Sequence, residues 1–233
     1  MPVSALAGDL TIAAPVPAEA LAFARYIASI HERDPFTESG PLAVVIEASQ
    51  PGVNKQSRLL AIRLTDESER SEYHVLQRDG HAAVTRAEVA PYLTAQQQVE
   101  DLPVSSVLIT PANYKFRYLG EVPSEGAPAY AFRIVPKKKR YGLIRGELWL
   151  DSVTGVVALQ SGHLVKTSSP VIRRIELVRD TKLVGGQASV RFTRVAIERQ
   201  LSGRGHLTIT EFRPLAADEA EVSEAQAGAV AGQ

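Results

Sequence analysis

From about Gly40 onward, hydrophobic and polar residues alternate with a period of two, as they do in strands that are half-buried in a sheet. Short turns rich in Gly, Pro, Asp and Ser separate the alternating segments. Parallel strands need crossovers of a dozen or more residues, so the short links predict an antiparallel meander. The predicted strands are 41–49, 57–67, 71–80, 113–122, 127–136, 142–151, 155–162, 171–180, 188–201 and 205–214.

Two segments show a helical period instead. Pro17 opens the first, which runs to Asp34 and places Phe23, Tyr26, Ile27 and Ile30 on one side. The second, over residues 85–101, predicts one or two short helical turns because Pro91 lies inside it. Thr85 and Glu88 have the spacing of a capping box at its start.

The alternation divides each strand into a dry face and a wet face, which predicts a sheet with one face turned to the core. About ten strands make a sheet too large to stay flat, so we expect strong curvature around a helix or a cavity. The apolar strand residues are then either plain core or the lining of a ligand cavity, and the sequence leaves both open. The cavity candidates are Leu60, Ile62, Leu76, Phe132, Ile134, Leu148, Leu150, Ile175, Leu177, Phe192, Leu207 and Ile209.

Two other features are candidates for contact with a ligand or partner. Trp149 is predicted to face away from Leu148 and Leu150, where it either packs on a neighbouring strand or touches a ligand at the mouth of the sheet. Lys137, Lys138, Lys139 and Arg140 form a cationic run between two predicted strands. The run is either a solvated hairpin loop or a contact to lipid phosphate or to an anionic partner surface.

Composition narrows the class of protein. Lys and Arg together number 26, as do Asp and Glu, and this balance argues against a dedicated nucleic-acid binder. The chain has no cysteine, which excludes disulfides and thiolate zinc sites. The five histidines show no metal-ligand spacing, and no nucleophile motif or phosphate-binding loop is present. We therefore predict a non-enzyme with no metal, no cofactor and no membrane-spanning segment.

The ends of the chain differ from its middle. Residues 1–16 have the composition of a flexible lead, residues 17–214 form one predicted domain, and residues 215–233 form a low-complexity tail that cannot bury a core. The start of the chain lacks the charged and apolar regions of a signal peptide.

Residues Tyr130–Lys139 read Y-x-F-x-I-x-P-K-K-K, and Gly142–Gly155 contain G-E-L-W-L-D-x-x-T-G. With the Gly162-His163 strand end and the strand R-x-I-E-L-V-R-D, they resemble the outer-membrane lipoprotein carrier and sorting superfamily, the LolA/RseB-like proteins. The resemblance extends from about residue 17 to about residue 213. It implies a mainly β (α+β) fold: one strongly curved antiparallel sheet, an unclosed barrel of about 10–11 strands with an N-terminal helix and a short helical lid.

The same resemblance implies a soluble periplasmic carrier, whose signal peptide has been removed or is not part of this sequence. Its concave apolar face would hold the acyl chains of a lipid or lipoprotein, delivered by or to a membrane-bound donor or acceptor protein. The alternative is an envelope sensor or protein-interaction module, whose sheet is filled by its own helix and carries no lipid.

Overall fold

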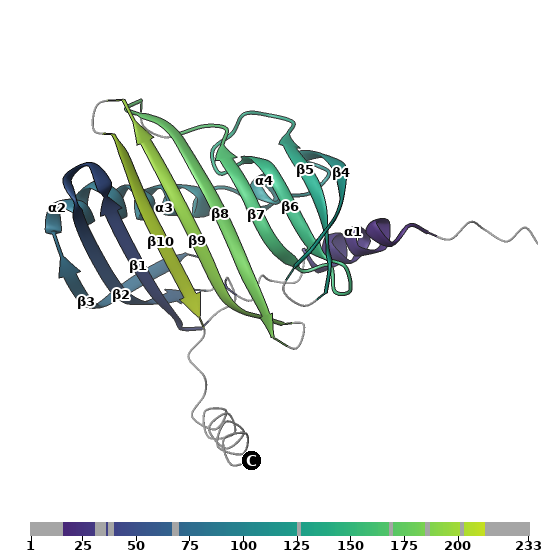
Figure 1. Cartoon of the computed structure of the whole chain (residues 1–233), viewed down its shortest axis with the longest axis horizontal. Coiled ribbons are helices and arrows are strands. Elements are labelled where there is room, and N and C mark those ends of the chain that lie inside the picture. The colour runs from purple at the N-terminus through teal and green to yellow at the C-terminus, as the bar shows by residue number, and fades with distance from the viewer. Residues whose placement is uncertain are drawn as a thin grey trace, which may run out of the picture.

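One continuous antiparallel sheet of ten strands forms the body of the protein in the computed structural model (Figure 1). The structure describes residues 16–30, 36, 40–66, 70–124, 127–167, 170–184, 187–200 and 203–212. The strands are β1 (Leu42–Gln50), β2 (Lys55–Thr65), β3 (Ser71–Gly80), β4 (Tyr114–Val122), β5 (Ala129–Pro136), β6 (Ile144–Asp151), β7 (Val157–Leu164), β8 (Ile172–Val184), β9 (Gln187–Arg199) and β10 (Arg204–Phe212). The predicted flexible lead and low-complexity tail lie almost entirely outside the described residues.

The spatial order of the strands is β3-β2-β1-β10-β9-β8-β7-β6-β5-β4. The chain therefore lays down three strands, crosses to the far end of the sheet, and returns as a meander until β10 pairs with β1. β3 and β4 are the two edges, so the sheet does not close into a barrel. The predicted unclosed antiparallel sheet with an N-terminal helix and a short helical segment is confirmed.

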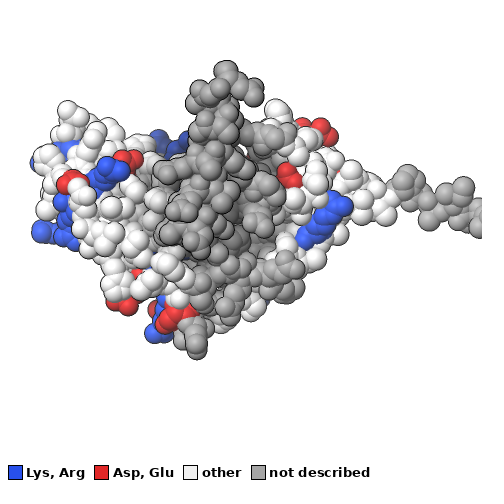
Figure 2. Space-filling view, turned by 90° about the horizontal axis from the view of Figure 1, so that it is seen from below, with Lys and Arg blue, Asp and Glu red and all other residues white. Residues whose placement is uncertain are grey.

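The helices lie on one side of the sheet, behind it in the view of Figure 1. They are α1 (Ala18–Ser29), α2 (Ala82–Val84), the π-helical turn η2 (Thr85–Val89), α3 (Ala90–Glu100) and α4 (Val104–Val107), and a 3₁₀ turn (Pro51–Val53) links β1 to β2. No described helix has the length and hydropathy needed to cross a membrane. Seen from below, charged side chains of both signs are scattered over uncharged surface (Figure 2), in keeping with the net charge of zero.

The dry face carries two separate cores, one beneath each group of helices. The α3-side core consists of Phe36, Leu42, Val44, Ile46, Ala48, Leu59, Ala61, Val84, Val89, Val195, Ile197, Leu207 and Ile209. The α1-side core consists of Tyr26, Tyr114, Phe132, Ile134, Leu143, Ile144, Leu148 and Leu150, with Phe23, Ile27 and Ile30 of α1 packed against it. The predicted apolar side of the N-terminal helix is thus confirmed. Leu177 of β8 is half-buried and packs against both cores.

The dry-face assignment is wrong for β2 and β9, and the cause is the same in both strands. On β2 the buried residues are Leu59, Ala61 and Arg63, so Leu60 and Ile62 point to the opposite face. Arg63 is buried because it donates to the Glu211 carboxylate and to the Phe36 carbonyl. An arginine within a strand usually indicates the wet face, but a paired arginine can be buried.

On β9, Arg191 and Thr193 lie on the dry face with Val195 and Ile197, so Phe192 is turned to the other side. Leu76 of the edge strand β3 is also outside the core, with 62% of its surface exposed. It lies where the β2–β3 register shifts, between the partners of Leu60 and Ala61.

The turn between β6 and β7 fixes α1 on the sheet. One Asp151 carboxylate oxygen accepts hydrogen bonds from the Val153 and Thr154 amides and from the Thr154 hydroxyl. Gly155 follows at φ +76°, and a Cβ there would lie 2.7 Å from the Ala22 carbonyl oxygen of α1. The D-x-x-T-G word in the sequence therefore encodes a turn on which a helix rests.

A buried ion pair fixes the second helical segment. Glu88, which is fully buried, accepts two hydrogen bonds from Arg199 of β9, at 2.9 and 2.7 Å, and a third from Gln50. Arg199 also donates to the Ala87 carbonyl at 2.8 Å. Pro91 has no N–H to donate to that carbonyl four residues before it, so the arginine satisfies an acceptor that proline leaves open.

The predicted capping box is wrong, because the helical segment already begins at Ala82. The Thr85 hydroxyl is hydrogen-bonded to that of Ser57 instead, and the Glu88 carboxylate is taken by Arg199 and Gln50. The segment stays helical through Pro91 by way of the π-helical turn η2, a common way to absorb a disruption within a helix.

Alkaline pH is expected to destabilise the fold through buried tyrosines. Burial raises the pKa of Tyr114 to about 12, although its oxygen accepts a hydrogen bond from the Ile144 amide. An unfolded tyrosine ionises near pH 10, so this contribution to stability is complete below about pH 10 and is lost between about pH 10 and 12. Denaturant unfolding at pH 9 to 11 should show the loss, and Tyr114→Phe should reduce its slope. An unchanged slope in that variant would contradict the assignment to Tyr114.

Candidate functional site

The middle of the concave face, between the two cores, is the candidate functional site, because its residues are only partly buried in the part of the chain that the structure describes. We name it the seam and define it by three dry-face residues of β7, three in the middle of β8, and one neighbour on β6. All of them are half-buried, whereas the dry-face residues of β5, β6 and β10 on either side are mostly fully buried. The seam consists of Gly146, Gln160, Gly162, Leu164, Ile175, Leu177 and Arg179.

Two glycines remove side chains from the middle of the seam. Gly146 of β6 pairs with Gly162 of β7, and Gly162 pairs with Leu177 of β8. The next residue in the same row is Ile134 of β5, so no side chain stands between Ile134 and Leu177. Neither glycine can be replaced simply, because a Cβ on Gly146 would lie 1.9 Å from the Ser161 carbonyl oxygen.

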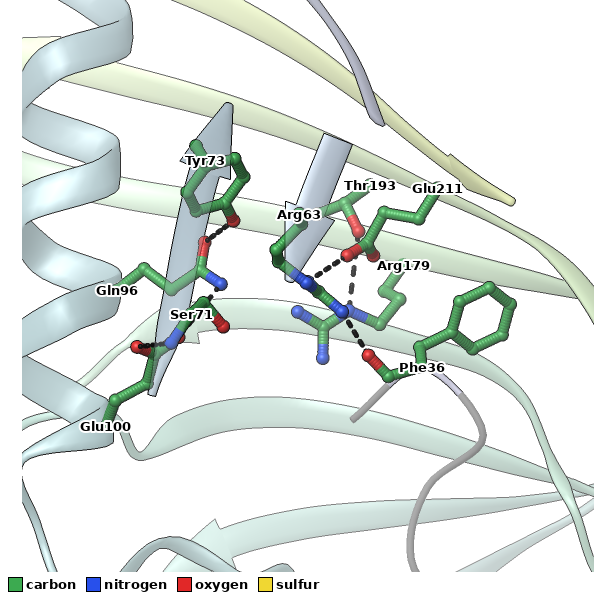
Figure 3. Close-up of polar contacts among 9 residues, drawn as sticks. All are labelled: Phe36, Arg63, Ser71, Tyr73, Gln96, Glu100, Arg179, Thr193 and Glu211. Atoms are coloured by element: carbon green, nitrogen blue, oxygen red, sulfur yellow. Dashed lines mark hydrogen bonds and ion pairs between the residues drawn. The ribbon is translucent and has the colours of Figure 1, made fainter. Parts of the chain in front are cut away.

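One end of the seam is polar and cationic. On the dry face, Arg179 of β8 is followed by Thr181, and Arg191 and Thr193 of β9 lie beside them. Arg179 Nε donates to Thr193 Oγ1 over 3.4 Å, and Figure 3 shows these two residues with Arg63 and Glu211. The Arg191 guanidinium lies 4.1 Å from the centre of the Phe36 ring. We name Arg63, Arg179, Arg191, Thr181, Thr193 and Glu211 the arginine cluster.

The electrostatics of the arginine cluster extend to two tyrosines. Burial raises the pKa of Tyr92 of α3, Glu211 and Tyr73 raise it further, and Arg179 and Arg63 oppose them. Desolvation is the largest single effect on the pKa of Arg63 and would lower it, but the Glu211 carboxylate, Tyr73 and Tyr92 together outweigh desolvation and raise the pKa. The guanidinium groups of Arg63 and Arg179 therefore both act on the phenol of Tyr92. Tyr73 itself donates to Gln96 of α3 at 3.0 Å, which ties the edge strand to the helix (Figure 3).

The structure divides the predicted cavity residues into three groups. Phe132, Ile134, Leu148 and Leu150 are buried in the α1-side core, and Leu207 and Ile209 in the α3-side core. Ile175 and Leu177 lie in the seam. Leu60, Ile62, Leu76 and Phe192 are outside the dry core. A ligand-contact role for any of these residues stays a prediction, and Ile175 and Leu177 are the ones best placed for it.

Trp149 lies on the face opposite Leu148 and Leu150, as predicted, and is half-buried. Its indole N–H donates to a Glu147 carboxylate oxygen at 3.3 Å. This geometry agrees with packing on the outer face of the sheet and keeps the residue away from the seam.

The cationic run forms the loop between β5 and β6, and all four of its residues are exposed. Lys137, Lys138 and Arg140 line a pocket of about 130 Å³ together with Ala112, Asn113 and Leu143. Lys137 Nζ donates to the Pro111 carbonyl at 2.6 Å, which holds the loop against the chain before β4. A larger pocket of about 430 Å³ lies at the other end of β4, lined by Glu121, Val122, Pro123, Ser124 and Pro128. Contact of the loop with a charged surface stays a prediction.

Sequence reasoning did not anticipate the arginine cluster. Arg63, Arg179 and Arg191 occupy alternating positions in strands, where a charged residue usually indicates the wet face. A usable signal was present: on β8, Ile175, Leu177 and Arg179 share one face, so an arginine continues an apolar row. Among the residues that the structure describes, no group of three or more His, Cys, Asp or Glu side chains is placed to hold a metal ion.

Comparison with known proteins adds one structural likeness. No family model matches the chain, and no curated protein matches it. A LolA superfamily protein of Nitrosomonas europaea aligns over 86% of this chain and 96% of its own, with 12% sequence identity and a TM-score of 0.34. MucB, solved in complex with MucA(peri), aligns over 85% and 94%, with 12% identity and a TM-score of 0.22.

Proposed function

We propose that this chain is a non-catalytic periplasmic protein that binds the acyl chains of a lipid or lipoprotein at the seam of its concave face. The observation that carries the proposal is the position of Leu177. It contacts both cores, yet it is only half-buried, and the two glycines beside it, Gly146 and Gly162, leave no side chain between it and Ile134. Burying apolar surface at such a site drives binding by about 25 cal/mol per Å².

The packed cores define where the ligand would enter. The α1-side and α3-side cores are already filled by aromatic and aliphatic contacts, such as Phe23 on Phe116 at 4.9 Å between ring centres. An acyl chain placed on the seam adds to these cores without displacing them. An acyl chain that extends beyond the seam would require α1 or α3 to move away from the sheet. The cationic loop is proposed as the contact to an anionic membrane or partner surface.

Substitution in the seam is expected to weaken binding. Leu177→Asn removes apolar contact and adds a polar group, so affinity for a fluorescent fatty-acid probe should fall roughly ten- to a hundredfold. The matched control is Val178→Asn, on the same strand but the opposite face, which should change affinity less than about twofold. Native mass spectrometry of the purified wild type should also reveal co-purified lipid. Delipidated wild-type protein that binds no acyl probe would overturn the proposal.

A sensor or protein-interaction module is the second candidate, because the two helix-covered cores already fill much of the concave face with the protein's own side chains. The two functions separate in one experiment: a pull-down from envelope extract followed by lipid extraction of the captured material. Capture of one specific protein, together with a lipid-free wild type that ignores acyl probes, would favour this second function.

A further inference from the structure

We infer that the arginine-bearing end of the seam binds the anionic head group of the acyl ligand, a carboxylate or a phosphate, with Arg179 as the main contact. This inference rests on the proposed function and extends it from acyl chains in general to acidic amphiphiles. It assigns the two ends of the ligand to two ends of one row of side chains on β8.

Arg179 differs from Arg63 in how its charge is balanced on the concave face. Arg63 is committed to the Glu211 carboxylate and the Phe36 carbonyl, and its Nε is buried without a hydrogen-bond partner. Arg179 makes one long contact, to Thr193 Oγ1 at 3.4 Å. Within the described ranges no carboxylate lies within ion-pair distance of Arg179. Glu211 is already paired with Arg63, so the half-buried Arg179 gains most from an added anion.

Several hydrogen-bond donors lie beside Arg179. The β7–β8 register pairs Gln160 with Arg179, so an amide stands next to the guanidinium on the same face. Thr193 supplies a hydroxyl from β9, and the phenol of Tyr92 lies within electrostatic reach of both arginines. A guanidinium offers a planar fork of N–H donors that fits a carboxylate or a phosphate with two parallel hydrogen bonds.

An apolar row of side chains leads away from Arg179. Leu177 and Ile175 precede it on the same face of β8, and Gly162 and Leu164 accompany them on β7. From Arg179 to Ile175 the strand covers about 13 Å at 3.3 Å per residue. A free anion would use only the polar end, whereas an acidic amphiphile uses the whole row. The geometry therefore favours a ligand with both parts.

Comparing ligands that share a chain and differ in the head group tests the inference. The delipidated full chain is titrated with dodecanoate, dodecyl phosphate and neutral dodecanol below their micelle-forming concentrations, and with inorganic phosphate alone. We expect the two acidic amphiphiles to bind about ten- to a hundredfold more tightly than dodecanol. Arg179→Gln should remove this preference and leave dodecanol affinity unchanged. Arg173→Gln, an exposed arginine on the same strand, is the matched control and should behave as the wild type.

Each outcome decides a separate point. Equal wild-type affinity for dodecanol and the acidic amphiphiles would overturn the head-group site and leave the proposed function standing. Failure of all three amphiphiles to bind would overturn both. Inorganic phosphate binding as tightly as dodecyl phosphate would show a simple anion site and overturn the amphiphile assignment. Because the wild-type comparison needs no variant, the test stands even if Arg179→Gln fails to fold; Arg179→Lys, which keeps the charge, should retain part of the preference.

Discussion

Replacing Arg199 by methionine is expected to lower the free energy of unfolding by about 3–5 kcal/mol. The change leaves the fully buried Glu88 carboxylate without its cation, and it removes the hydrogen bond that Arg199 donates to the Ala87 carbonyl. Because removing one partner of a buried pair costs far more than the pair itself is worth, the effect should be among the largest of any single substitution here. Denaturant unfolding followed by circular dichroism measures it.

Two comparisons make this expectation specific. Arg194→Met removes an exposed arginine from the same strand and should change stability by less than about 0.5 kcal/mol. Glu88→Gln combined with Arg199→Met removes both charges and should recover part of the loss. If the double variant loses as much free energy of unfolding as the two single variants added together, the ion pair is not the source of the destabilisation.

Gly155→Ala is expected to cost about 2–4 kcal/mol and to loosen α1 selectively. The positive φ of +76° accounts for about 1 kcal/mol, and overpacking against a neighbouring backbone typically adds about 1–3 kcal/mol. The new Cβ would meet the Ala22 carbonyl at 2.7 Å and the Tyr26 amide nitrogen at 2.9 Å. Hydrogen exchange should show lost protection in residues 18–29, with smaller effects in β1 and β10.

Gly203→Ala provides the control for backbone strain. Gly203 has nearly the same φ, +77°, and a Cβ there would meet nothing within 4 Å. Its cost should therefore be limited to the strain of about 1 kcal/mol. Equal destabilisation by the two substitutions would mean that the contact between the Gly155 turn and α1 contributes nothing measurable.

The sheet was predictable from sequence because its information is local. Alternation in segments such as GELWLD fixes both the strand and its faces, and Leu148, Trp149 and Leu150 lie where that pattern predicts. The strand count and the meander follow from turn spacing. No local pattern in the chain specifies that the sheet stays unclosed, and the expectation of an unclosed barrel came from the resemblance to LolA/RseB-like proteins.

The site was less predictable because it depends on pairing between distant residues. In β2 all four residues of Leu59–Ile62 are apolar, so only the charged Arg63 indicates which face of the strand is wet. Arg63 is instead buried, because it pairs with Glu211, and the two faces are therefore reversed. Likewise, Glu88 has the spacing of a capping residue, and only the return of β9 reveals that it faces Arg199. Long-range electrostatics of this kind leave no periodic mark in the sequence.

The pairing of β1 with β10 has a consequence for how the chain acquires its structure. Ala43 pairs with Phe212, so the α3-side core combines residues from near the two ends of the domain. Contacts between such distant segments slow folding, because a long loop must close before they form. Until β10 arrives, β1 presents an unpaired apolar edge of the kind that promotes aggregation. A nascent chain that ends before β10 therefore exposes this edge, and we expect chaperones to bind it.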